Sequence, residues 1–225
     1  MHNHIKQKRI YCGNEYLEVD IYPRTKNQID TPKGKRPKKR NVTKPAQNNL
    51  NDARAKRYFI QLLNANFGKN DYHLTLTYKM TKHPKSLEDA EKRVRNYISR
   101  LNYKRKKMGL KSSKYVIVTE YKSKDGEAID IHHHIIMDGD LTRDEVEDLW
   151  REKKQKGKKI GESIGRTNCI KLQPDEDGVA GLAHYLTKYE YRKRRWTAST
   201  NLIKPQEVIN DHVFKIGRAS CRERV

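Results

Sequence analysis

The chain has 225 residues, of which 35% are charged and 34% hydrophobic, and its formal net charge is +22. This excess of lysine and arginine predicts a polyanionic partner, most often nucleic acid, although a merely soluble basic protein is the alternative. No apolar stretch approaches the roughly 20 residues that cross a bilayer, which excludes a membrane-spanning protein. The three cysteines are far apart, which excludes a CxxC zinc site and a disulfide framework. The basic N-terminus lacks a signal-peptide pattern, so we expect a cytoplasmic protein.

Residues 1–48 are predicted to form two short strands and a basic linker. KRIYCGNEYLEVDIY (8–22) places a turn signal, Cys-Gly-Asn, between two apolar runs. Residues 24–47 are rich in Lys, Arg and Pro, which is typical of a flexible linker. This linker either contacts phosphates without sequence preference or serves as a solvated spacer. We therefore expect the main domain to cover residues 49–205.

From residue 49 onward the pattern alternates between helices and strands. After a helix that ends near Gly68, strands are expected at 72–78, 114–121, 129–137 and 168–174, and helices at 86–109, 141–153 and 178–196. Ser86 and the Thr142–Glu145 pair supply helix start signals, and Gly109 supplies a stop signal. The order is the β-α-β-β-α-β pattern with an extra helix. It predicts an α+β, ferredoxin-like fold, in which helices pack on one face of an antiparallel sheet.

The last eleven residues, KIGRASCRERV (215–225), look foreign to the rest of the chain. They can be back-translated into a string that resembles a common sequencing adapter. We therefore expect that the native reading frame was interrupted near Phe214, and we exclude residues 215–225 from fold and function. The chain remains strongly basic without them.

Three consecutive histidines lie in the third expected strand. Because strand side chains alternate between faces, His132 and His134 point to one face and His133 to the other. Ile131 and Ile135 share the face of His133, so that face is predicted to meet the core. Two imidazoles on the more polar face, two residues apart, can share one metal ion. The alternative is that the histidines are structural.

Glu120, in the preceding strand, is the candidate third ligand. Opposed residues across an antiparallel hairpin have a constant number sum. A two-residue turn at Asp125-Gly126 gives a sum of 251, which places Glu120 opposite Ile131, on the wrong face. An odd-numbered loop centred on Gly126 gives 252, which places Glu120 opposite His132. With the second geometry or a bulge, two histidines and one carboxylate suit Mg²⁺ or Mn²⁺.

A tyrosine and a lysine lie three residues apart in the last expected helix. Tyr185 and Lys188 are neighbours on the helix surface and project together, away from the centre of the apolar stripe. One interpretation is a half-buried tyrosine beside a solvated lysine. Next to a metal site in a basic protein, a tyrosine nucleophile is the better interpretation.

Taken together, these motifs resemble those of the HUH endonucleases. HHH inside a strand, a preceding strand that ends in an acid, and a later helix with YxxK occur here in the order and spacing of that family. LTLTY (74–78) lies where the first motif of the family is found. With KRRWTASTNLIKP (193–205), the chain most resembles replication-associated proteins of the phage and plasmid gene II/ORF2 type. The resemblance covers about residues 50–205.

The resemblance implies a rolling-circle replication initiator in a bacterial host cell. In such an enzyme, Tyr185 would attack single-stranded DNA at a replication origin, leaving a 5′-phosphotyrosine and a free 3′-OH. The metal, Mg²⁺ or Mn²⁺, would be held by His132, His134 and Glu120, while Lys188 assists the tyrosine and Tyr189 matches a second tyrosine of some members. Contacts to nucleic acid are expected from Arg192, Lys193, Arg194 and Arg195.

Two other functions remain open on the sequence alone. Relaxases and single-tyrosine transposases use the same chemistry, and a non-catalytic nucleic-acid-binding protein would need the histidines only for structure. The chain has no Walker A motif, because GKKIGES (157–163) lacks the Lys-Ser/Thr ending. A replication initiator of this kind would therefore rely on a host helicase and polymerase as partners.

Overall fold

The computed structural model describes residues 4–24, 34, 45–123, 126–154, 156–157, 160–188 and 195–213. The chain divides into two compact units, one formed by residues 1–66 with 203–225 and the other by residues 67–202. The expected adapter-like segment lies outside the described residues, as does most of the expected basic linker. The expected domain boundary near residue 48 remains a prediction.

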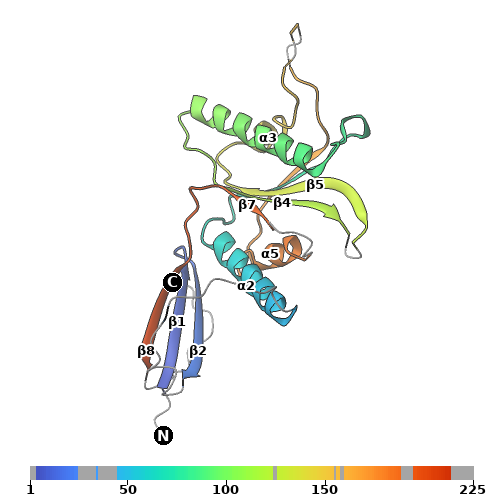
Figure 1. Ribbon diagram of the computed structural model, residues 1–225. Coiled ribbons are helices and arrows are strands. Elements are labelled where there is room, and N and C mark those ends of the chain that lie inside the picture. Colours follow the sequence, from blue (N-terminus) through green and yellow to red (C-terminus); the bar gives the residue numbers. More distant parts are fainter. Residues whose placement is uncertain are drawn as a thin grey trace. The chain divides into compact units, whose positions relative to one another are not determined.

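In its described residues, the first unit consists of a small antiparallel sheet and one helix. Its strands, in the order β2-β1-β8, are β1 (His4–Cys12), β2 (Tyr16–Arg24) and β8 (Gln206–Val213) (Figure 1). The predicted hairpin around Gly13 is present, and this glycine has a φ of 70°, a conformation that glycine adopts at little cost. The pairing of β8 with β1 was not predicted, because it joins segments about 200 residues apart in the sequence.

Helix α2 (Pro45–Asn64) belongs to the same unit and is tied to β2 by charged groups. Arg57 pairs with Glu18 and with Asp20, each at 2.7 Å, and Gln61 donates a hydrogen bond of 2.7 Å to Glu18. Phe59 and Leu63 are fully buried in α2. The helix is therefore held by both packing and hydrogen-bonded charge pairs.

The second unit contains a five-stranded antiparallel sheet with the order β6-β3-β5-β4-β7. Its strands are β3 (Tyr72–Leu76), β4 (Tyr115–Lys122), β5 (Ala128–Met137), β6 (Thr167–Lys171) and β7 (Thr197–Ala198). Its helices are η1 (Met80–Lys82), α3 (Leu87–Lys107), α4 (Arg143–Glu147) and α5 (Ala180–Leu186). The β3-α3-β4 segment joins two strands that have β5 between them in the sheet, and the β5-α4-β6 segment joins two strands that have β3 between them. This is the split β-α-β arrangement. The predicted α+β, ferredoxin-like class is confirmed.

The two faces of this sheet meet different helices. One face contributes alternate residues of the strands to the core beneath α3 and α4: Leu74, Leu76, Ile117, Ile135 and Met137, packed with Val94, Tyr97, Leu101, Val146 and Trp150. Helix α5 lies on the opposite side of the sheet from α3 (Figure 1), where Tyr185 contacts His134. Helices therefore cover both faces, so the prediction that they pack on one face is wrong. Helix α5 covers the face to which the predicted metal ligands point.

Helix α4 is shorter than predicted at its C-terminal end. Its start is as expected, because Thr142 and Glu145 form a complete capping box. The expected helix to residue 153 is wrong, since the chain turns after Glu147 and buries Trp150, whose Nε1 donates a 2.8 Å hydrogen bond to the carbonyl oxygen of Thr77. Burial of the large indole with its N–H satisfied outweighs continuation of the helix.

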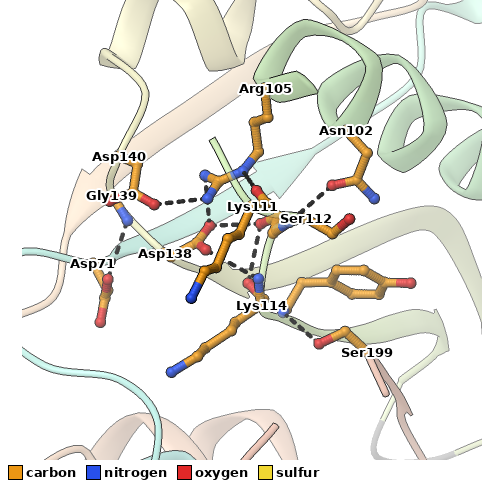
Figure 2. Close-up of polar contacts among 12 residues, drawn as sticks. Asp71, Asn102, Arg105, Lys111, Ser112, Lys114, Asp138, Gly139, Asp140 and Ser199 are labelled. Atoms are coloured by element: carbon orange, nitrogen blue, oxygen red, sulfur yellow. Dashed lines mark hydrogen bonds and ion pairs between the residues drawn. The ribbon is translucent and has the colours of Figure 1, made fainter. Parts of the chain in front are cut away.

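A buried arginine connects the end of α3 to the end of β5 (Figure 2). Arg105 is 1% exposed, and its guanidinium contacts Asp138 at 3.1 Å and Asp140 at 2.6 Å. Its Nε donates to the carbonyl oxygen of Lys111 at 2.7 Å. Asp138 also accepts a hydrogen bond of 2.6 Å from the hydroxyl of Ser113. This network anchors the strand that carries the three histidines.

Candidate metal centre and tyrosine site

The hairpin between β4 and β5 adopts the register that a shared site requires. Glu120 lies opposite His132, with a number sum of 252, whereas Lys122 lies opposite Ala128, with a sum of 250. The required register therefore comes from a bulge, and not from an odd-numbered loop centred on Gly126. Gly126 in the connecting loop has a φ of 83°, and the pairing shifts between Glu120 and Lys122, which marks a bulge. The bulge lies beyond Glu120, so the carboxylate and the imidazoles share one face of the sheet.

The side chains of Glu120, His132 and His134 converge. The Oε2 atom of Glu120 lies 3.3 Å from Nε2 of His132, and its Oε1 atom lies 3.7 Å from Nε2 of His134. One ligand atom of each residue lies within 4.8 Å of the others. An octahedral ion with bonds of about 2.1 Å holds adjacent ligand atoms about 3 Å apart. The group could hold a metal ion after small side-chain movements.

Two buried atoms of this group have unmet bonding capacity. Oε1 of Glu120 and Nε2 of His134 have no hydrogen-bond partner among the residues that the structure describes. A buried polar atom without a partner costs about 1–3 kcal/mol, and more for a charged group. Both atoms are metal-ligand types, and a bound cation would satisfy both at once. The residues present therefore fit a divalent ion.

The protonation states of Glu120 and His134 also suit a cation, whereas His132 would have to give up a proton to bind one. Burial raises the pKa of Glu120. The hydrogen bond with His132 and the nearby His134 and Lys188 together lower the pKa by more than burial raises it, so it lies below its usual range. Burial lowers the pKa of His134 to about 4. The hydrogen bond with Glu120 raises the pKa of His132. At neutral pH the carboxylate is therefore ionised and His134 is neutral, as metal ligation requires.

The outer nitrogen of each candidate histidine ligand faces a polar group. Nδ1 of His132 lies 2.9 Å from the carbonyl oxygen of Asp130. Nδ1 of His134 lies 3.1 Å from Nε2 of His73 and 3.4 Å from the hydroxyl of Thr75, both on β3. His73 was missed from the sequence. The sequence pattern that could have indicated His73 is YHLTL (72–76), in which His73 alternates with apolar residues. This alternation puts His73 on the polar face of the strand together with Thr75.

His133 lies on the other face, as predicted. It is fully buried, and its two ring nitrogens lie 2.7 Å from the hydroxyls of Tyr78 and Thr119. Its ring meets Trp150 edge-on at 6.4 Å. Both nitrogens are therefore engaged within the core, and His133 holds β5 in place between the two candidate ligands.

Helix α5 carries Tyr185, and the turn after it brings Lys188 to the same group. The expected helix over 178–196 is therefore wrong at both ends, since α5 begins at Ala180 and ends at Leu186. The ring of Tyr185 meets the ring of His134 edge-on, with centroids 5.7 Å apart, and 47% of this tyrosine is exposed. Nζ of Lys188 lies 4.0 Å from the centre of the Tyr185 ring and 3.9 Å from Oε1 of Glu120. The structure thus assembles five of the residues singled out from the sequence: Glu120, His132, His134, Tyr185 and Lys188.

The structure does not place the other predicted site residues in this cluster. Tyr189 and the basic residues 192–194 lie outside the described residues. Arg195 is described and partly exposed, just before β7. Their contacts to DNA remain predictions.

Comparisons with known proteins place the chain in a family. Within the described residues, no helix has both the length and the apolar character to span a bilayer. Searches of curated proteins and of solved structures gave no significant match. The model of one family, the replication-associated proteins of the ORF2/gene II protein type, matches residues 71–193, more than half of the chain and all of the cluster above. The chain therefore belongs to this family of replication-associated proteins.

Proposed function

We propose that this replication-associated protein is a metal-dependent HUH endonuclease that initiates rolling-circle replication. It would nick and rejoin single-stranded DNA at an origin through a 5′-phosphotyrosine intermediate. The observation that carries this proposal is the meeting of Tyr185 and Lys188 with the Glu120–His132–His134 group on one face of the sheet. A purely structural role for the histidines gives no reason why two buried ligand atoms lack a hydrogen-bond partner among the described residues.

In the proposed reaction, the phenol oxygen of Tyr185 attacks the scissile phosphorus. A bond forms between that oxygen and phosphorus as the phenol gives up its proton to solvent. At the same time the bond from phosphorus to the 3′ oxygen breaks, and the departing oxygen takes up a proton from solvent. The products are a 5′-phosphotyrosine and a 3′-OH that can prime synthesis. Attack by a 3′-OH on the phosphotyrosine reverses the step and closes a circle. A divalent ion, Mg²⁺ or Mn²⁺, would polarise the scissile phosphate and stabilise its developing charge.

Lys188 serves the tyrosine electrostatically in this proposal. Its ammonium lies close both to the Tyr185 ring and to the Glu120 carboxylate. A positive charge there favours the phenolate over the phenol and offsets the charge of the incoming phosphate. The carboxylate in turn keeps the lysine at the site.

DNA and host proteins complete the proposed function. The net charge of +22 favours binding to the phosphate backbone. Arg192, Lys193, Arg194 and Arg195 would contact the strand next to the tyrosine, and Tyr189 would be a second nucleophile. A host helicase and polymerase would separate and extend the strands.

The test is cleavage of a pool of single-stranded oligonucleotides with a randomised centre, in the presence of Mn²⁺. We expect the wild-type protein to cleave a subset of the pool, and the Tyr185→Phe variant to leave that subset intact. The matched control is Tyr103→Phe, which changes an exposed tyrosine on α3 and should cleave normally. We also expect the double variant His132→Ala/His134→Ala to be inactive.

The outcomes separate the competing functions. Cleavage by Tyr185→Phe at the wild-type rate would refute the nucleophile, and cleavage by the double histidine variant would refute the metal site. Binding of the pool without cleavage by the wild-type protein would instead support a non-catalytic nucleic-acid-binding protein.

A further inference from the structure

We infer that His73 is a positioning residue for the metal centre, which accepts the Nδ1 proton of His134 and so presents the Nε2 lone pair of His134 toward Glu120. This inference rests on the proposed metal-dependent function and extends it to a residue on another strand. His73 is not itself proposed as a ligand.

Strand pairing brings the two imidazoles together. β3 and β5 are antiparallel neighbours, and Thr75 lies opposite His134. His73 is two residues before Thr75, so it shares the same face of the sheet. Nε2 of His73 lies 3.1 Å from Nδ1 of His134, and the rings stack with centroids 5.3 Å apart and an interplanar angle of 26°. The contact therefore follows from backbone register rather than from a mobile loop.

The two nitrogens at this contact can share only one proton. A neutral imidazole has one donor nitrogen and one acceptor nitrogen. If His134 donates from Nδ1, its Nε2 carries a lone pair and can bind a cation. If His73 donates instead, Nε2 of His134 carries the proton and is blocked. The hydroxyl of Thr75, 3.4 Å from the same Nδ1, can either donate or accept, so it is compatible with the first arrangement.

His132 shows the same arrangement with a different partner. Its Nδ1 faces the carbonyl oxygen of Asp130 at 2.9 Å, and a carbonyl can only accept. Once His132 gives up its second proton to bind a cation, Nδ1 keeps the remaining proton and Nε2 is left as the acceptor, with no second imidazole involved. His73 takes the place of that carbonyl for His134. Partners of this kind fix the orientation and tautomer of a ligating histidine, and their loss typically costs roughly 10–100-fold in metal affinity.

The experiment measures Mn²⁺ affinity by calorimetry in three variants of the full chain. His73→Phe keeps a stacking ring but removes the acceptor, and we expect the dissociation constant to rise about 10–100-fold with little change in melting temperature. His73→Gln retains an acceptor oxygen and should restore affinity at least in part. His184→Phe changes an exposed histidine on α5 and should bind as the wild type does.

The results distinguish this inference from the proposed function. If the wild type binds Mn²⁺ and His132→Ala/His134→Ala does not, the metal centre stands. In that case, wild-type affinity in His73→Phe would overturn the role of His73. If the wild type and the double variant bind alike, the metal centre itself is refuted, and the inference falls with it.

A second measurement needs no variant at position 73 and covers the case in which His73→Phe fails to fold. In metal-free wild-type protein with ¹⁵N-labelled histidine, NMR reports which ring nitrogen of His134 carries the proton, with His134→Gln identifying the signal. We expect the Nδ1–H tautomer. An Nε2–H tautomer would overturn the inference.

Discussion

Replacing Arg105 with methionine should destabilise the second unit strongly without touching the candidate site. The guanidinium is almost fully buried and contacts Asp138, Asp140 and the carbonyl oxygen of Lys111. Breaking a buried ion pair by removing one partner costs about 3–5 kcal/mol. Asp140 is more than half exposed, so its ion pair with Arg105 contributes little to the free energy of unfolding. Asp138 keeps its hydrogen bonds from Ser113 and the neighbouring backbone. We therefore expect a loss of about 3 kcal/mol.

The assay is urea denaturation combined with thermal unfolding. A loss of about 3 kcal/mol corresponds to a fall in melting temperature of roughly 10 °C for a chain of this size. Arg105→Lys keeps the positive charge but not the forked geometry of the guanidinium. The melting temperature of this variant should therefore lie between those of wild type and Arg105→Met. Arg95→Met is the matched control, because the Arg95–Glu91 pair is exposed and should contribute less than about 1 kcal/mol. A loss below about 1 kcal/mol in Arg105→Met would refute this account of the network.

Three further predictions concern the site and the buried thiols. Glu120→Gln should weaken Mn²⁺ binding by more than about 100-fold, which exceeds the loss expected for a residue that only supports a ligand. The control is Glu127→Gln, which changes an exposed acid in the same hairpin and should leave Mn²⁺ affinity unchanged. Equal Mn²⁺ affinities of the two variants by calorimetry would contradict the site. In metal-free protein, stability should fall as pH drops from about 6.5 toward 4, because unfolded His134 takes up a proton in this range while folded His134, with its pKa lowered to about 4, does not. His134→Gln should flatten that dependence, and an unchanged slope in thermal unfolding would count against it. In a Cys221→Ser variant, Cys12 and Cys169 should resist alkylation at pH 8 until the chain unfolds. Burial raises the pKa of Cys12 to about 12 and that of Cys169 to about 11, so few thiolates form. Rapid labelling of either cysteine in the native protein, detected by mass spectrometry, would contradict their burial.

Side-chain alternation and helix signals were enough to predict the main elements of the second unit. The division of His132, His133 and His134 between two faces follows from strand geometry alone. The capping box at Thr142 and Glu145 is likewise present as predicted. Such features depend on neighbours in the sequence, which is why local pattern captures them.

Features that depend on distant contacts could not be predicted in the same way. The hairpin register depends on a bulge between Glu120 and Lys122, and the sequence could not decide between this bulge and the two loop geometries. The end of α4 depends on where the Trp150 indole finds a carbonyl partner, 73 residues away at Thr77. The placement of His73 beside His134 requires the pairing of β3 with β5, which joins residues 61 positions apart. Alternation in YHLTL indicates that His73 shares the polar face with Thr75, but the sequence does not indicate that this strand pairs with β5.

The central claim is that Tyr185 becomes covalently joined to DNA at the Glu120–His132–His134 group. The most direct measurement traps the adduct between the wild-type chain and single-stranded DNA in denaturant, digests it, and locates the modified residue by mass spectrometry. We predict a 5′-phosphotyrosine at Tyr185 that forms only with a divalent ion. The absence of an adduct at Tyr185 from a fully randomised pool would contradict the account, whether or not Tyr189 or another residue reacts.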